Sequence, residues 1–392
     1  MKVILMKRLF GLGAGLALVV ALAGCGGDQG SADVSAPTSA AQQLSIVATT
    51  TQVAEFTRSV VPGGWEVTQL LAPGTSAHSF DPTAADLMAI GSADVLVTSG
   101  AGLETWLDDA TTAAGFDGAV IDASEGIVLS GDHDHDHGDE GHTHDDEADD
   151  HDHDHDDDGH DHDHSDDADH ADEQHDDEAA GDSDEDHTTE DDHDGDDHDH
   201  GEHNPHIWLD PLGAETMVTN IAEGLAAQDS ANAQTFRDNA AAYIAKLETL
   251  DSWIAENIDA VPQDQRLLVS NHDAFHYYND RYGVTFVGSI IPNFEDNAEP
   301  SAARLQELID DIKELGVKAV FSETAIDPRT AEQIASSAGV EVYVGDDALY
   351  ADSLGPKGSE GDTYFKSMIH NTTMLLNSWG ASATEPPAEL KS

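Results

Sequence analysis

The side chains best suited to chemistry in this chain are imidazoles and carboxylates concentrated in one tract. Residues 131–203 hold 18 of the 23 histidines and 37 of the 80 acidic residues, and they contain no Lys, Arg, Phe, Tyr, Trp, Ile, Leu or Val. Spacings such as HDHDHDH bring imidazoles within joint reach of one cation in an extended chain, and both ligand types bind divalent cations. We therefore expect several low-affinity metal sites there. Their histidines are His133, His135, His137, His142, His144, His151, His153, His155, His160, His162, His164, His198, His200 and His203.

Five histidines lie outside the tract, and three of them occupy predicted loops that could meet. His78 in LAPGTSAHSFDP follows a predicted strand, and His206 in NPHIWLDP lies between two prolines. His272 in LLVSNHDAF ends a predicted strand, and Asp352 in ALYADSLG follows a strand and a turn. Ligands of open α/β sheets gather at the carboxyl ends of the strands. These four side chains are therefore candidates for one metal site.

Each of these residues also has a simpler interpretation. A single loop histidine is more often a surface residue than a ligand, and Asp352 could cap a turn. His276 would lie one helical turn after His272, on a helix face or against a ligand. His370 falls in mid-helix and is expected to be structural or exposed. The metal-site hypothesis therefore depends on the set and not on any one member.

The elements that must position these residues alternate between strands and helices. Before the tract, the pattern predicts strands at residues 44–49, 65–71, 95–98 and 119–122. It predicts helices at 50–61 from a Thr cap, at 82–91 with Asp81 as N-cap and Pro82 at the first helical position, and at 103–114. Such alternation is typical of a parallel sheet in an α/β fold.

The same alternation resumes after the tract. A helix at 211–227 is followed by a long amphipathic pattern at 231–258, with apolar residues three and four positions apart. Strands are then predicted at 267–270, 284–287, 319–322 and 340–344, with helices from 271 through Tyr278 and at 301–315, 328–338 and 364–379. The expected fold class is α/β, with two (β/α) Rossmann-like lobes joined by a long helix.

The two ends of the chain and the tract complete the expected domain organisation. Lys2, Lys7 and Arg8 precede an apolar stretch that ends in Leu-Ala-Gly-Cys, a lipobox that predicts cleavage before Cys25 and a diacylglyceryl group on its sulfur. The expected segments are a lipoprotein signal peptide at 1–24, a flexible tether at 25–43, an N-terminal lobe at 44–228 interrupted by a disordered insert at 131–203, a linking helix at 229–260 and a C-terminal lobe at 261–392.

Charge excludes several classes of partner. The formal net charge of −65 comes from 15 basic and 80 acidic residues, and the tract alone contributes −37. The remainder carries 15 − 43 = −28, which disfavours binding to nucleic acid or anionic substrates.

Cys25 is the single cysteine, so no internal disulfide is expected. No helical HExxH, GxSxG or P-loop motif occurs in the chain.

Five segments together resemble the metal-specific solute-binding lipoproteins of ABC importers, the cluster A-I (cluster 9) family, and most closely its zinc-binding branch. They cover nearly all of residues 44–380 apart from the tract. The segments are LLAPGTSAHSFDPTAADL, NPHIWLDP, SNHDAFHYYNDRYGV, EPSAARLQELIDDIKELGVKAVFSE and LYADSLGPKGSEGDTYFKSMIHN.

The resemblance implies a rigid linking helix and a metal in the cleft between the lobes. It carries the metal ligands onto His78, His206, His272 and Asp352. The third of these is His in zinc-type members and often Glu in manganese-type members. Glu323 falls on a family motif near the cleft and is expected beside a ligand and not on the metal. His276 stands where the family often has Gly, and the zinc branch often has a His/acid-rich loop where the tract lies.

We therefore expect a non-enzymatic, monomeric protein that captures Zn²⁺ outside the cytoplasm and delivers it to an ABC-type metal permease, anchored by its lipid. Four protein ligands argue against a zinc hydrolase, which usually keeps a position for water. The alternatives are a manganese importer component and a surface zinc buffer or adhesin-like protein. The tract would be a scavenger or sensor, or simply a solvated acidic segment. Proton competition should weaken binding below roughly pH 6.

Overall fold

The structure is a computed structural model that describes residues 43–130, 203–291 and 299–391. Several predictions therefore lie outside the described residues. These are the signal peptide, the lipid attachment at Cys25, residues 25–42 of the tether and every tract histidine except His203.

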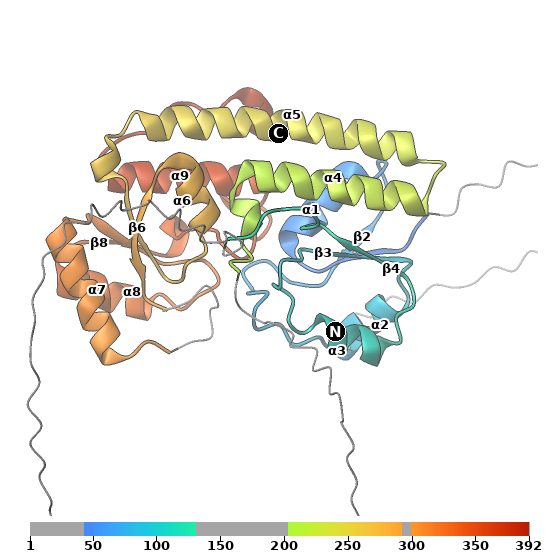
Figure 1. The fold of residues 1–392 in the computed structure, drawn as a ribbon, viewed down its shortest axis with the longest axis horizontal. Coiled ribbons are helices and arrows are strands. Elements are labelled where there is room, and N and C mark those ends of the chain that lie inside the picture. Colours follow the sequence, from blue (N-terminus) through green and yellow to red (C-terminus); the bar gives the residue numbers. More distant parts are fainter. Residues whose placement is uncertain (1–42, 131–202, 292–298, 392) are drawn as a thin grey trace, which may run out of the picture. The chain divides into compact units, whose positions relative to one another are not determined.

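A four-stranded parallel sheet forms the framework of the N-terminal region (Figure 1). Its strands are β1 (Ile46–Ala48), β2 (Val67–Gln69), β3 (Val95–Thr98) and β4 (Ala119–Asp122), in the spatial order β2-β1-β3-β4. Val47 of β1 is in register with Thr68 and Leu96. All residues of β1 and β3 are buried, as expected for central strands covered on both faces.

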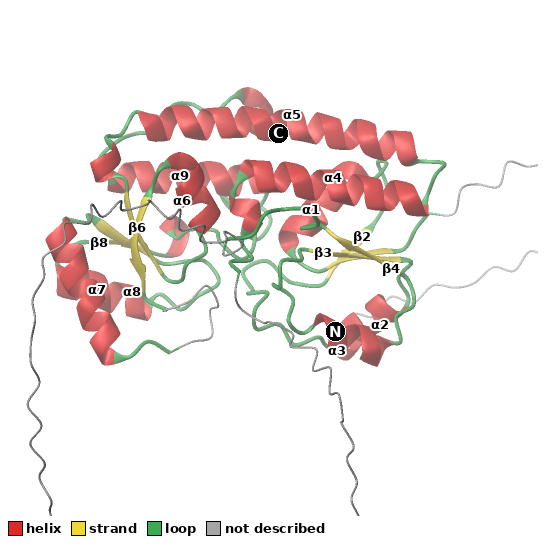
Figure 2. Cartoon of the chain, viewed as in Figure 1, coloured by secondary structure: helices red, strands yellow, loops and turns green. Residues whose placement is uncertain are grey.

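Helices cover both faces of this sheet (Figure 2). They are α1 (Thr51–Val60), α2 (Ala84–Gly91), α3 (Leu107–Ala114) and α4 (Pro211–Gln228). Figure 1 shows α1 and α4 on one side of the sheet and α2 and α3 on the other. The Thr50 side chain caps α1 by accepting a hydrogen bond from the Val53 N–H, as the sequence predicted.

The long helix α5 (Ala233–Asp259) links the two regions of the fold. At about 1.5 Å per residue it is roughly 40 Å long. It packs against α1 and α4 on the N-terminal side, and against α6 (His276–Tyr282), α9 (Tyr364–Ser378) and the short turn Ala388–Lys391 on the C-terminal side. Its buried face carries Phe236, Leu247, Leu250 and Ile254, which follow the predicted helical spacing.

The C-terminal region contains two pairs of parallel strands. β5 (Leu267–Ser270) pairs with β6 (Thr285–Ser289), and β7 (Ala319–Phe321) pairs with β8 (Glu341–Tyr343). β5 also lies beside β7, so the four strands are neighbours. The remaining helices are α7 (Ala302–Leu315) and α8 (Arg329–Ala338). The fold class predicted from the alternation is confirmed.

The predicted starts of α2, α3 and α6 were wrong, and α3 begins at Leu107 and not at residue 103. α2 begins at Ala84 and not at Pro82, because Thr83 and Asp86 form a capping box in which each side chain accepts a hydrogen bond from the other's backbone N–H. α6 begins at His276 and does not follow β5 directly. Glu323 accepts a hydrogen bond from the His272 N–H and donates its own N–H to Asn271, which holds the intervening segment out of the helix.

None of the helices in the described ranges has both the length and the apolar character needed to cross a membrane.

Candidate metal centre

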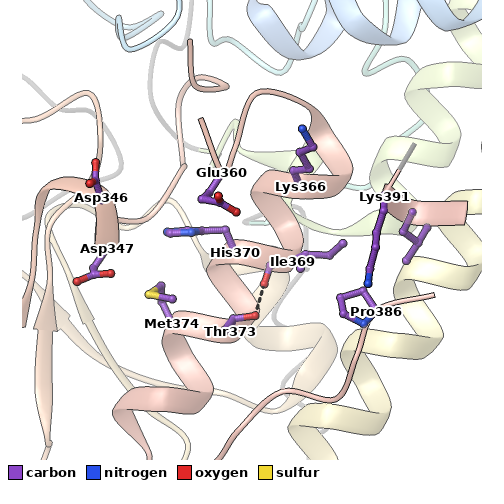
Figure 3. A pocket seen from close by; sticks show the side chains of 11 residues that line it. Asp346, Asp347, Glu360, Lys366, Ile369, His370, Thr373, Met374, Pro386 and Lys391 are labelled. Atoms are coloured by element: carbon purple, nitrogen blue, oxygen red, sulfur yellow. Dashed lines mark hydrogen bonds between the residues drawn. The ribbon is translucent and has the colours of Figure 1, made fainter. Parts of the chain in front are cut away.

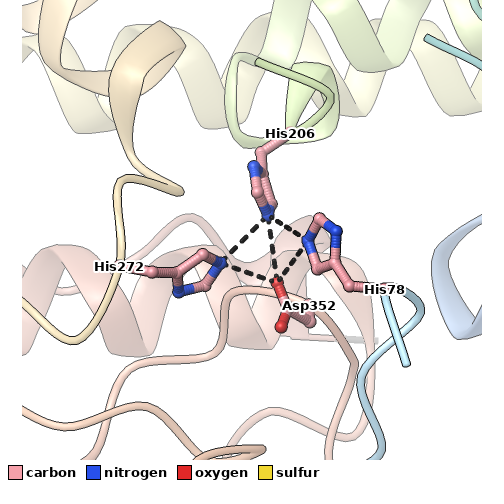
Figure 4. Close-up of side chains that lie close together, drawn as sticks. All are labelled: His78, His206, His272 and Asp352. Carbon is pink, nitrogen blue, oxygen red and sulfur yellow. Dashed lines mark hydrogen bonds and ion pairs between the residues drawn. The ribbon is translucent and has the colours of Figure 1, made fainter. Parts of the chain in front are cut away.

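Four side chains from distant parts of the sequence meet at one point (Figure 4). His206 Nε2 lies 3.2 Å from His78 Nε2 and 3.1 Å from His272 Nε2. Asp352 Oδ1 lies 3.1 Å from the ring of His206, 3.3 Å from that of His272 and 3.9 Å from that of His78. All four ligand atoms fall within 4.8 Å of one another, and this is the one such group among the described residues.

The spacing and burial of the group suit a tetrahedral cation. With bonds of ~2.0–2.1 Å, a tetrahedral zinc site places its ligand atoms about 3.3 Å apart, close to the observed distances. The four side chains are at most 4% exposed. Three imidazoles and one carboxylate are donors that zinc and several first-row cations accept.

His78 is presented by the loop between β2 and α2. The Ser76 Oγ accepts a hydrogen bond from the His78 N–H at 3.2 Å, and the Trp106 indole donates to the carbonyl of Ala77 at 3.1 Å. Gly74 donates its N–H to Ser353 Oγ at 2.9 Å, which ties this loop to the loop of Asp352. Hydrogen bonds at Gly74, Ala77 and the His78 N–H therefore hold the backbone that presents the His78 ring.

Asn204 determines which nitrogen of His206 faces the group. Asn204 Oδ1 accepts a hydrogen bond from the His206 backbone N–H at 3.1 Å. Because a backbone N–H can only donate, the oxygen of the Asn204 side chain, and not its nitrogen, must face it. The same oxygen lies 2.8 Å from Nδ1, so this nitrogen must carry the proton. The lone pair of Nε2 is then directed at the other three residues. Burial lowers the pKa of His206 to about 3, which keeps the ring neutral at pH 7.

Glu323 supports His272 in the same way, but with a charge. Its Oε2 lies 2.6 Å from His272 Nδ1, and its Oε1 accepts the His272 N–H at 3.1 Å. Burial lowers the pKa of His272, but the carboxylates of Glu323 and Asp352 outweigh it and hold the pKa well above its usual range. Metal-bound histidines commonly donate their second ring N–H to such a carboxylate.

Asp352 lies in a loop that the N-terminal region holds in place. The Ala351 carbonyl accepts hydrogen bonds from the side chains of Gln52 (3.3 Å) and Trp208 (3.0 Å), and Leu354 donates its N–H to Thr51 Oγ1. Burial raises the pKa of Asp352, but His272 and His206 outweigh it and leave the pKa well below its usual range. Asp352 Oδ2 is buried without a hydrogen-bond partner among the described residues, as a carboxylate that serves a cation would be.

The structure places the other predicted residues outside this group. His276 lies at the start of α6, where its Nε2 is 3.3 Å from Asp280 one turn ahead, and its side chain is 35% exposed. His203, the described tract histidine, places Nδ1 3.0 Å from the carbonyl of Ser130.

His370 lines a separate hollow of about 470 Å³ whose lining includes none of the four clustered residues (Figure 3). Its Nε2 lies 3.0 Å from the carbonyl of Ala348, and burial lowers the pKa of the ring. Asp346, Asp347 and Glu360 also line the hollow, but they do not converge on His370 as a group of metal ligands. We therefore interpret His370 as a structural histidine.

Two residues that hold the group were not found by sequence reasoning. Asn204 lies two positions before His206, and an Asn before a turn often bonds to the backbone two residues on, so a local signal was present. Gln52 acts on a carbonyl 299 residues away in sequence. No local pattern could have identified its partner.

A family model for ZnuA, described as the periplasmic component A of the zinc-uptake complex, matches residues 46–378. The iron ABC transporter substrate-binding lipoprotein MtsA of Streptococcus pyogenes is 32% identical over 171 residues, which are 44% of this chain and 54% of the relative. The manganese-binding lipoprotein MntA of Halalkalibacterium halodurans is 29% identical over 174 residues, 44% of this chain and 56% of the relative. The chain thus spans about half the length of these curated relatives.

The solved structure of the periplasmic zinc-binding protein TroA from Treponema pallidum is similar to most of the chain. It superposes with a TM-score of 0.64 at 20% sequence identity, covering 86% of this chain and 99% of that protein. The similarity supports the α/β fold described above. The names of these three proteins refer to iron, manganese and zinc, so similarity alone does not identify the cation.

Proposed function

Because the chain belongs to the ZnuA family of periplasmic zinc-uptake components, we propose that it captures Zn²⁺ outside the cytoplasm and delivers the ion to an ABC-type metal permease. Members of this family are solute-binding proteins and not enzymes. In this proposal zinc is the cargo, and its ligands are His78, His206, His272 and Asp352. The observation that carries it is the buried group of three imidazoles and one carboxylate at tetrahedral spacing.

Charge supports the capture of a divalent cation. The carboxylates of Asp352 and Glu323 are both buried at the group, and a dication would compensate them. The imidazole of His206 is already neutral, as a ligand must be, whereas that of His272, with its raised pKa, must release a proton when zinc binds. Four protein ligands leave a tetrahedral ion no position for an activated water, which suits transport better than hydrolysis.

Zinc titration of the full-length protein tests this proposal. We compare the wild type with a variant that lacks residues 131–203 and with His206→Ala, using competition against a chromophoric chelator. The tightest zinc-binding event should survive the deletion and be lost in His206→Ala. Loss of the tightest event on deletion would move the principal site to the tract and reject the four-residue site.

A manganese importer component is the second candidate, because one of the similar relatives is named as manganese-binding. Replacing an imidazole by a carboxylate makes a site harder and favours Mn²⁺ over Zn²⁺. His272→Glu should therefore shift the ratio of zinc to manganese affinity toward manganese. An unchanged ratio would argue against His272 as a ligand.

We also propose that Cys25 carries a lipid that keeps the protein near its permease. The lipobox sequence supports this, and the relatives MtsA and MntA are named lipoproteins. Two acyl chains hold a protein at a membrane much more firmly than one. Cys25→Ala should release the protein from the membrane fraction of expressing cells, and continued membrane association would contradict the lipid anchor.

A further inference from the structure

Asn204 makes hydrogen bonds to the segments of two proposed ligands. Its Oδ1 accepts both the backbone N–H and the ring Nδ1–H of His206. Its Nδ2 donates to the carbonyl of Asp273 at 2.5 Å, in the residue directly after His272. Asn204 is 4% exposed, so water competes little for these bonds. One buried amide therefore fixes the ring of His206 and ties the loop of His272 to it.

Tyr277 connects Asn204 to the residue that precedes the tract. The Tyr277 hydroxyl donates to the Asn204 carbonyl at 2.7 Å and accepts the N–H of Ser130 at 3.1 Å. Asn204 also donates its N–H to Ser130 Oγ at 3.3 Å, and His203 lies against the Ser130 carbonyl. Ser130, directly before the tract, and residues 203 and 204 thus lie side by side, and Asn204 among them also bonds to the segments of two proposed ligands.

We propose that Asn204 is a positioning residue for the bound cation and that Tyr277 couples it to Ser130. The contacts that hold Ser130 against residues 203 and 204 thus help to set the zinc affinity of the four-residue site. The inference rests on the proposed metal-binding function. The chain of contacts runs from Ser130 through Tyr277 and Asn204 to His206 and to the residue after His272. A shift of Ser130 or Tyr277 would move Asn204, which would turn the lone pair of His206 Nε2 and move the loop of His272.

The size of the effect follows from the kind of bond that is lost. Hydrogen-bond partners of metal-bound histidines typically contribute 10–100-fold to metal affinity. A neutral hydrogen bond one step further away contributes ~0.5–1.5 kcal/mol, or about 2–12-fold. We therefore expect Asn204→Ala to weaken zinc binding at the tight site by roughly 10–100-fold. Tyr277→Phe should weaken it by about 2–12-fold.

The experiment measures zinc binding by full-length variants at neutral pH, in competition with a chromophoric chelator. Tyr278→Phe is the matched control, because Tyr278 is the next residue of α6 and its hydroxyl bonds to Thr372 Oγ1, away from the group. It should bind zinc as tightly as the wild type. If Tyr277→Phe binds zinc no more weakly than Tyr278→Phe, the coupling to Ser130 is wrong. Thermal unfolding verifies that each variant is folded.

A second readout separates positioning from general stability. The ¹⁵N shifts of the His206 ring, identified by their absence in His206→Ala, report which nitrogen carries the proton in zinc-free protein. The wild type should show a proton on Nδ1, Asn204→Asp should retain it because an acceptor remains, and Asn204→Ala should lose the preference. An unchanged tautomer in Asn204→Ala would reject the positioning role.

The control His206→Ala distinguishes this inference from the proposed function. If His206→Ala keeps the tight site, the four-residue site itself is wrong. If His206→Ala loses the site while Asn204→Ala and Tyr277→Phe keep full affinity, only the inference about positioning fails.

Discussion

His206 and His272 present the same nitrogen to the same point, but the two regions of the molecule support them by opposite means. Asn204, a neutral amide, holds His206, and burial lowers the pKa of that ring to about 3. Glu323, a carboxylate, holds His272, whose pKa stays well above its usual range. Identical ligand types in one group thus differ in how readily they hold a proton.

The comparison extends to Asp352. Although it follows β8 in sequence, its loop is held by Gln52, Thr51 and Trp208 of the N-terminal region. The segment of Asp352 is thus held from both sides, because Leu349 also pairs with Glu323 and the Tyr350 N–H donates to Asn371 of the C-terminal region.

The largest expected effect on zinc affinity comes from removing one of the two compared histidines. His206→Ala should weaken zinc binding by more than the ~10–100-fold that the partner of a ligand contributes, because the ligand itself is lost. His272→Ala should also weaken binding, but by less, because the raised pKa of His272 means that zinc must displace a proton from this ring. Chelator competition measures both, with His276→Ala as the exposed-histidine control. Equal losses in the two variants would remove the proposed asymmetry.

Glu323→Gln makes the partner of His272 neutral, like that of His206. The amide oxygen can still accept the Nδ1–H, but the charge that supports the ring is gone, so zinc affinity should fall by roughly 10–100-fold. The exposed Glu332→Gln on α8 provides the control. Affinity equal to that of the wild type would mean that the carboxylate does not distinguish the two histidines.

Glu55 joins α1 of the N-terminal region to α9 and makes this contact pH-dependent. It accepts the Tyr364 N–H and the Tyr243 hydroxyl, and burial raises its pKa from 4.5 to about 7. The folded state thus binds this proton more tightly than the unfolded state, so its contribution to stability should fall as pH rises from about 4.5 to about 7. With allowance for partial exposure, the change is on the order of 2 kcal/mol.

Glu55→Gln should lack this fall. Denaturant unfolding at pH 5 and pH 8 measures the free energy of unfolding of the wild type and of the variant, with the exposed Glu66→Gln as control. The stability difference between Glu55→Gln and the wild type should grow in favour of the variant at pH 8. A difference independent of pH would show that Glu55 does not titrate between these values.

The smallest effect concerns the support of Asp352. Gln52→Met keeps the length of the side chain but removes the hydrogen bond to the Ala351 carbonyl, so zinc affinity should fall about 2–12-fold. Gln69→Met is the control, because the Gln69 amide bonds to Leu71 and not to the loop of Asp352. If Gln52→Met has no effect beyond that of Gln69→Met, the N-terminal region does not position Asp352 through this contact.

The sequence by itself determined the alternation of strands and helices, the long helix α5 and the four residues that meet. Strand and helix periods are local, and the apolar spacing of Phe236, Leu247 and Leu250 is visible in the residues themselves. Family segments in the right order then identified His78 and Asp352, which are 274 residues apart (352 − 78). The Thr83–Asp86 capping box was also local, so the start of α2 could have been predicted.

The tertiary structure alone decided how these residues are held. The start of α6 depends on bonds from Glu323 to residues 271 and 272, and the support of Asp352 depends on Gln52 and Trp208. The contrast between His206 and His272 likewise arises from one amide and one carboxylate that differ in charge. Such contacts join residues that are far apart in the chain, and their hydrogen-bond geometry exists only after the regions have packed together.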